Sequence, residues 1–339
     1  MSEACRHALG GAIPARRSQR PCTPSPPARE RRARVTLAQG PALDPQVWPV
    51  RYQGPRGTCN AFAVNAAEEL YRWLQDPDQG FEPLSDEYLY AMMRAIDLRD
   101  PRLNLDLNDR EIAQRERAGV TYLAQARLAL IENGVCTAEL APYTVFKPVN
   151  HRETAFSDAA HADAATRKGL ASDWQHHIVE PGEDRVFFGL DRRWEPPLEH
   201  DGAPQSCSDI IHRALMDGTP VVAGFCVLDG VGFGAWFGMS ALRFGTVTYP
   251  SDGLVGRDWL RPGGGHAVCI VGYDPGAAPG EGWFVFRNSF GAFGFSRDRE
   301  ADRLAPQALE RGYGYIPERD VDRYCWEILH RTVPQAHVA

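Results

Sequence analysis

The sequence has no CxxC pair, no HExxH motif and no apolar run near the ~18 residues that span a membrane. Its eight cysteines lack the spacing of a zinc site or a disulfide framework, which favours a reducing compartment. No continuous apolar stretch follows the first basic residue, as a secretory signal requires. We therefore expect a cytoplasmic protein with no metal, no other cofactor and no membrane association.

Residues 1–45 differ in composition from the rest of the chain. Eight arginines stand there against three acidic residues, so this stretch carries +5 and, with −7 for the whole chain, the remainder carries −12. Seven prolines and few apolar residues cannot offset the entropy lost on ordering, which predicts a disordered tail. Contact of this basic tail with nucleic acid is an alternative that the composition favours less.

One cysteine opens a long apolar stretch that begins at Cys59. Only five residues from Cys59 to Leu74 are polar and Pro77 follows, which predicts a largely buried helix ending near Asp76. The first turn of a helix favours a thiolate, the reactive form of cysteine. Gln53, six residues earlier, can form an oxyanion hole with the N–H of Cys59. This stretch alone leaves open that Cys59 is merely a small buried residue.

Other patterns predict helices in the first part of the chain and strands in the second. Ser85 precedes a helical pattern through Ile96, and another runs from 122 to 133. The charged stretch 97–117 predicts a loop or a solvated helix, and 141–204 predicts long loops with a short strand near 186–188. Ser208 is expected to cap a short helix. The stretch 219–228 is β-rich, and apolar or aromatic stretches at 266–273, 282–290 and 312–317 predict strands of one antiparallel sheet or half-barrel.

Two polar residues stand at the ends of these predicted strands. His266 follows three glycines and is expected to begin one strand, and Asn288 ends the next, twenty-two residues later. If the two strands pair, Asn288 can accept the ring N–H of His266, which leaves the other ring nitrogen for Cys59. An imidazolium beside a thiolate would supply both a nucleophile and an acid for the leaving amine.

These residues and their order resemble the papain-like cysteine peptidases, in a form similar to bacterial members. The stretches that carry the resemblance are PVRYQGPRGTCNAFA, LSDEYLY, GVCTAELAPY, GTPVVAGF, GGHAVCIVGY, FRNSFGAFG and GYGYIP. The resemblance implies an α+β fold of two lobes with the active site in the cleft between them. A helical left lobe at 46–145 would carry the nucleophile, and an antiparallel, β-barrel-like right lobe at 146–339, with inserted loops, would carry the histidine and asparagine.

The resemblance also implies a role for each matching residue. Cys59 would be the nucleophile, His266 the general base and acid, Asn288 the residue that orients it, and Gln53 an oxyanion donor. Two further residues, Gly265 and Ala267, would contact substrate, through backbone and as part of a pocket floor respectively.

The sequence departs from the family pattern near the nucleophile. Arg56 stands where secreted relatives carry a disulfide cysteine, and Asn60 and Phe290 stand where the family carries aromatic residues. His266 and Asn288 lie 207 and 229 residues after Cys59, beyond the family's ~130–150, so the chain must contain insertions.

We accordingly expect a thiol endopeptidase that hydrolyses peptide or isopeptide bonds of a protein or peptide substrate through an acyl-enzyme. A transpeptidase or cyclase using the same site is one alternative. A catalytically degenerate papain-fold module that binds protein is another, and the sequence leaves the oligomeric state open.

Overall fold

The computed structural model describes residues 32–37, 46–103, 105, 107–147, 155–169, 171–178, 206–229, 235–249, 261–276, 281–294 and 311–332. Helices dominate the first part and strands the second, as expected for an α+β protein. The strand expected near 186–188 lies outside the described residues. None of the described helices has the length and apolar character needed to cross a membrane.

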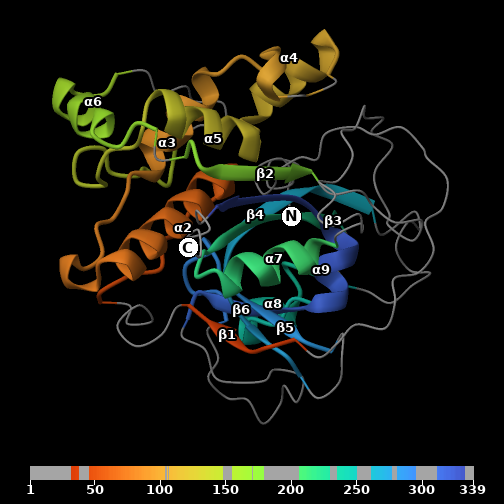
Figure 1. Ribbon diagram of the computed structural model, residues 1–339. Coiled ribbons are helices and arrows are strands. Elements are labelled where there is room, and N and C mark those ends of the chain that lie inside the picture. Colours follow the sequence, from red (N-terminus) through yellow and green to blue (C-terminus); the bar gives the residue numbers. More distant parts are fainter. Residues whose placement is uncertain are drawn as a thin grey trace, which may run out of the picture.

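The first helices gather on one side of the molecule, and among them α2 and α5 contact strands of the sheet (Figure 1). They are α2 (Cys59–Gln75), α3 (Asp86–Ala95), α4 (Asp109–Ala118), α5 (Leu123–Glu132) and α6 (Asp158–Ala165), with 3-10 turns η2 (Pro77–Gln79) and η3 (Pro101–Leu103). Helix α3 packs on α2 and α5, and its start is capped by Ser85, whose hydroxyl accepts the N–H of Tyr88 at 2.9 Å. The predictions of α2, α3 and α5 are confirmed.

Helix α6 lies where the sequence predicts long loops. Ser157 caps it, and Ala160 and Ala164 pack in a small cluster with Tyr88 of α3. Its sequence, DAAHADAA, is rich in alanine and has no large apolar residues, so it shows no helical periodicity to detect. The helical part therefore extends past the boundary expected at residue 145.

The described strands form one seven-stranded antiparallel sheet in the order β2-β7-β3-β4-β5-β6, with β1 paired to β4. Their bounds are β1 (Val35–Thr36), β2 (Trp174–Ile178), β3 (Val221–Asp229), β4 (Arg261–Asp274), β5 (Trp283–Arg287), β6 (Tyr313–Pro317) and β7 (Cys325–Arg331). Among these strands β2 and β6 are not paired with each other, so the sheet is open and the expected barrel-like closure is absent. The sequence patterns do not predict β7, which lies between β2 and β3.

His266 lies within β4 and does not begin the strand, as the sequence suggested. The strand starts at Arg261 because the glycines before His266 remain extended: Gly264 and Gly265 pair with Val227 and Cys226 of β3. Gly264 has φ 152°, a backbone conformation that glycine adopts far more readily than residues with a side chain. On its other side β4 pairs with β5, as predicted, which brings the residue after β5 toward the middle of β4.

Helices α7 (Cys207–Met216), α8 (Met239–Phe244) and α9 (Glu318–Tyr324) lie with the sheet (Figure 1). The prediction that Ser208 caps α7 is wrong by two residues. Ser206 is the cap, because its hydroxyl accepts the N–H of Asp209 at 3.1 Å and the Asp209 carboxylate accepts the N–H of Ser206 at 3.0 Å. This reciprocal pair satisfies two helix-end donors, which Ser208 inside the first turn cannot do.

One hydrophobic core joins α2 to the sheet. Helix α2 packs against β4 and β3, and the core contains Cys59 and Leu70 of α2 together with Ala267 and Ile270 of β4. Burying a leucine or isoleucine contributes about 1.5–3 kcal/mol, so this layer fixes α2 on the strand that carries His266.

Residues 32–37, here called the amino-terminal strap, contradict the prediction of disorder for this part of 1–45. Val35 pairs with Tyr273 and Thr36 with Gly272 of β4, and Leu37 donates its N–H to the carbonyl of Val271 at 2.9 Å. Backbone hydrogen bonds to β4 offset the entropy that the strap loses on ordering, and amino-acid composition gives no sign of such bonds.

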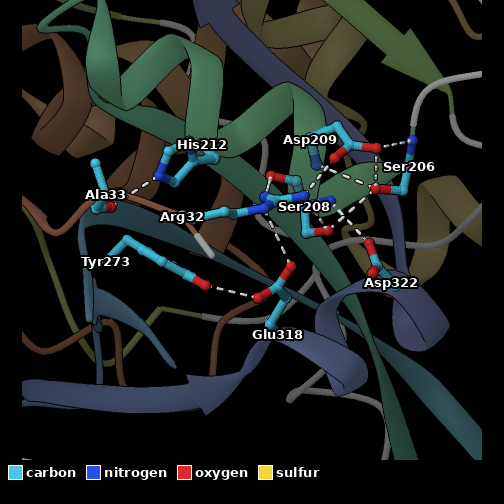
Figure 2. Close-up of polar contacts among 9 residues, drawn as sticks. All are labelled: Arg32, Ala33, Ser206, Ser208, Asp209, His212, Tyr273, Glu318 and Asp322. Carbon is cyan, nitrogen blue, oxygen red and sulfur yellow. Dashed lines mark hydrogen bonds and ion pairs between the residues drawn. The ribbon is translucent and has the colours of Figure 1, made fainter. Parts of the chain in front are cut away.

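Arg32 anchors the strap between α7 and α9 (Figure 2). Its guanidinium donates to the carbonyl of Ser208 and pairs with Asp209, and its Nε lies 3.3 Å from Glu318. The other Glu318 oxygen accepts from the hydroxyl of Tyr273 at 2.7 Å. The Arg32 side chain is only 10% exposed. Two carboxylates from different helices, those of Asp209 and Glu318, compensate its charge there.

Replacing Arg32 with alanine should lower the free energy of unfolding by about 2 kcal/mol, because it removes a cation that pairs with the buried Glu318 carboxylate. Arg34→Ala is the matched control, since the Arg34–Asp274 pair (2.8 Å) involves an arginine that is 56% exposed, and such pairs contribute under ~1 kcal/mol. Urea unfolding of both variants measures the difference. Equal losses would contradict the anchoring role of Arg32.

Candidate active site

Cys59 is the first residue of α2 and is fully buried. Thr58 occupies the cap position, but its side chain makes no capping hydrogen bond; its hydroxyl instead lies 2.9 Å from that of Tyr143. No acidic residue stands in the first turn. The positive potential of the amino end of α2 is therefore not offset by an acidic side chain in its own first turn, which favours an anion at Cys59.

His266 and Asn288 meet across the β4–β5 pair. The imidazole Nε2 lies 2.8 Å from Asn288 Oδ1, and the same oxygen accepts the N–H of Ser289 at 2.8 Å. An oxygen that receives the backbone N–H must be the amide oxygen, so Nε2 carries the hydrogen that it donates. In the neutral ring Nδ1 is then an acceptor, and it has no hydrogen-bond partner among the described residues.

Two aromatic rings enclose the imidazole. Phe290 stacks on it with centroids 4.3 Å apart and planes at 24°, and Trp236 meets it edge-on at 4.9 Å. Phe290 thus covers the imidazole ring. Sequence reasoning missed Trp236, which follows a glycine-rich stretch and carries no local signal of its place.

Burial lowers the pKa of His266 to about 4, while the hydrogen bond to Asn288 acts in the opposite direction. This pKa lies below the ordinary value of 6.5. As the pH falls from 6.5 to 4, the His266 ring therefore binds a proton in the unfolded chain but stays neutral in the folded protein. The free energy of unfolding therefore decreases over this pH range, by up to about 3 kcal/mol, because protonation favours the unfolded chain. An imidazolium here requires a nearby negative charge.

Gln53 is joined to the same cluster through Ser289. The N–H of Gln53 donates to the carbonyl of Ser289 at 2.9 Å, and the hydroxyl of Ser289 donates to Gln53 Oε1 at 2.5 Å. Gln53 Nε2 donates one hydrogen to the carbonyl of Arg56 at 2.8 Å. The side-chain amide is thus oriented from both ends. Ser289, which no motif singled out, connects Gln53 to Asn288 and so to His266.

The structure places Gly265 and Ala267 in β4 beside His266, and both are buried. Gly265 pairs with Cys226 of β3, and Ala267 lines a small cavity together with Asn288 and two arginines, Arg51 and Arg287. Neither residue is presented on the surface.

Asn60, which replaces an aromatic residue, is buried and not solvated. Its Nδ2 donates to the carbonyl of Thr121 at 2.9 Å and lies 3.3 Å from the Thr121 hydroxyl. This contact ties the start of α2 to the segment before α5.

Comparisons with known proteins identify the fold. No family model and no curated protein matches the sequence. Among solved structures, xylellain, a cysteine protease from Xylella fastidiosa, is 20% identical with a TM-score of 0.54 and covers 96% of this chain and 97% of its own. The proCathepsin B S9 of Trypanosoma congolense is 13% identical with a TM-score of 0.53, covering 99% of this chain and 90% of its own.

This chain has the papain-like fold. The papain-like fold agrees with the α+β architecture and the order of helices before strands. At these identities the likeness concerns the fold, and the chemistry of the site rests on the residues described above.

In a Cys59→Ala protein, the pKa of His266 should be near 4, because burial disfavours the imidazolium and no thiolate offsets it. NMR titration of the ring protons, assigned by comparison with a Cys59→Ala/His266→Gln protein, measures this value. A midpoint at or above the ordinary 6.5 would contradict the burial argument.

Proposed function

We propose that this chain is a cysteine-type peptidase that hydrolyses peptide or isopeptide bonds of protein or peptide substrates, with Cys59 as nucleophile. The observation that carries the proposal is the hydrogen bond from His266 Nε2 to Asn288, which leaves Nδ1 as a buried acceptor. Helix α2, which begins at Cys59, packs on the strand of His266. The papain-like fold supports the same assignment.

The proposed reaction uses each of the clustered groups. His266 Nδ1 takes the proton of the Cys59 thiol, and the sulfur attacks the carbonyl carbon of the substrate. The N–H of Cys59 and the second Nε2 hydrogen of Gln53 stabilise the negative oxygen of the tetrahedral intermediate. His266 then gives its proton to the leaving amine, and a water that it deprotonates cleaves the thioester.

The residues of the proposed site are not accessible to a substrate in this structure. Cys59, His266 and Gln53 are fully buried, as are the proposed substrate residues Gly265 and Ala267. A peptide can therefore reach Cys59 only after the groups that cover it move. We propose that opening precedes binding, and that Gly265 and Ala267 then contact the acyl part of the substrate.

Cys59→Ala and His266→Ala should each abolish turnover, whereas Gln53→Ala should lower kcat about 10²–10³-fold because one oxyanion donor is removed. Asn288→Ala should retain more activity than His266→Ala, since only the orientation of the ring is lost. Mass spectrometry of a peptide library after incubation measures cleavage and also reveals any joined peptides, the products of a transpeptidase. Cleavage that persists in Cys59→Ala would contradict the proposal.

Iodoacetamide at pH 6 should modify Cys59 much faster than the other cysteines, measured by peptide mapping of the native protein. All six described cysteines are buried, so accessibility in the closed structure predicts no difference between them. Burial raises the pKa of Cys136 to about 11 and raises that of Cys269 above its ordinary value, which keeps both as unreactive thiols. Uniform labelling would favour a degenerate binding module.

A further inference from the structure

A buried arginine lies in the turn between Gln53 and Cys59. Arg56 is 1% exposed, and its guanidinium forms a two-pronged pair with Glu87 of α3, at 2.6 and 3.0 Å. It also donates to the carbonyl of Thr144 at 2.7 Å and lies over the ring of Tyr143 at 4.7 Å. The side chain therefore joins the turn to α3 and to the segment that follows Tyr143.

The charges of this pair are balanced within the fold. Glu87 accepts additional hydrogen bonds from Lys147 Nζ at 3.0 Å and the N–H of Thr144 at 3.2 Å. Burial alone would raise the pKa of Glu87, but the bonds from Arg56 and Lys147 lower it below its ordinary value. The carboxylate stays charged, and Arg56 is held in one geometry by planar, two-pronged pairing.

The backbone of Arg56 controls the side chain of Gln53. Its carbonyl accepts from Gln53 Nε2 at 2.8 Å and from the N–H of Thr58 at 2.9 Å. Tyr143, on which the guanidinium lies, donates its hydroxyl to the carbonyl of Gln53 at 2.8 Å. A rotation of the Arg56 peptide would therefore turn the Gln53 amide away from the carbon that Cys59 attacks.

We propose that Arg56, held by Glu87, is a positioning residue for the oxyanion donor Gln53, an inference that rests on the proposed peptidase function. Its proposed effect on the reaction passes through Gln53. It acts by fixing the carbonyl that orients the Gln53 amide. Lysine cannot replace it, because an ammonium group lacks the planar fork that engages both Glu87 oxygens.

The test compares Arg56→Lys with a matched control, Arg331→Lys. Arg331 is also a nearly buried arginine on a carboxylate, with Nη2 2.6 Å from Glu68 Oε2 and the guanidinium 4.4 Å over the ring of Tyr71. Its partner lies nine residues beyond Cys59 on α2. Arg331 also pairs with Asp173 at 3.0 Å. Both substitutions therefore replace a nearly buried, carboxylate-bound guanidinium with an ammonium group, and only Arg56 lies in the Gln53 turn.

Arg56→Lys should lower kcat by about 10- to 100-fold with little change in KM, a part of the ~10²–10³-fold that a lost oxyanion donor costs. A peptide aldehyde, whose adduct places an oxyanion beside Gln53, should bind more weakly by a similar factor. The rate of iodoacetamide on Cys59 should stay within about threefold of the wild type, because alkylation forms no oxyanion. Glu87→Gln should give the same pattern, and Arg331→Lys should leave kcat within about threefold.

The results separate the proposed peptidase function from the proposed positioning role of Arg56. If Cys59 of the wild type is alkylated no faster than the other cysteines, the proposed function fails and this inference fails with it. If Cys59 is reactive but Arg56→Lys and Arg331→Lys have equal kcat and aldehyde affinity, the inference alone is overturned. Where Arg56→Lys does not fold, the same comparison made with Glu87→Gln decides it.

Discussion

The contact between Ser289 and Gln53 joins the two parts of the molecule on which the candidate site depends. Backbone and side chain both take part, at 2.9 and 2.5 Å, so the segment before α2 is held directly against the residue that follows Asn288. From Asn288 the contact continues to His266. Packing of helix α2 alone would not orient these polar side chains, because apolar packing is non-directional. Their orientation comes from hydrogen bonds, which are directional.

The candidate site and its surroundings differ in the way that they accommodate buried ionisable side chains. His266 sits among aromatic rings, and burial keeps it neutral unless a thiolate forms beside it. Buried or nearly buried arginines such as Arg56 and Arg331 instead form ion pairs with carboxylates from other segments of the chain. Breaking such a buried pair costs roughly 3–5 kcal/mol, whereas forming it contributes little net stability. These pairs therefore define geometry more than they add stability.

Sequence patterns located the elements that have strong local signals. The helix from Cys59, the cap at Ser85 and the pairing of β4 with β5 follow from apolar periodicity and capping chemistry, and the structure has them. Helix α6 was missed because alanine-rich turns have no periodic contrast. The strap was missed because its order comes from pairing with β4 and from the carboxylates that hold Arg32, which lie more than 170 residues away.

Local sequence patterns were enough to order the candidate groups: a cysteine at a helix start, a histidine on one strand and an asparagine at the end of the next. Local propensity and spacing are enough for that, because each signal spans only a few neighbours. Three features came from the folded arrangement alone: Nε2 is the nitrogen bonded to Asn288, Trp236 and Phe290 enclose the ring, and Ser289 and Arg56 hold Gln53. Those facts depend on contacts between distant segments, and no local pattern encodes the distance at which two such segments meet.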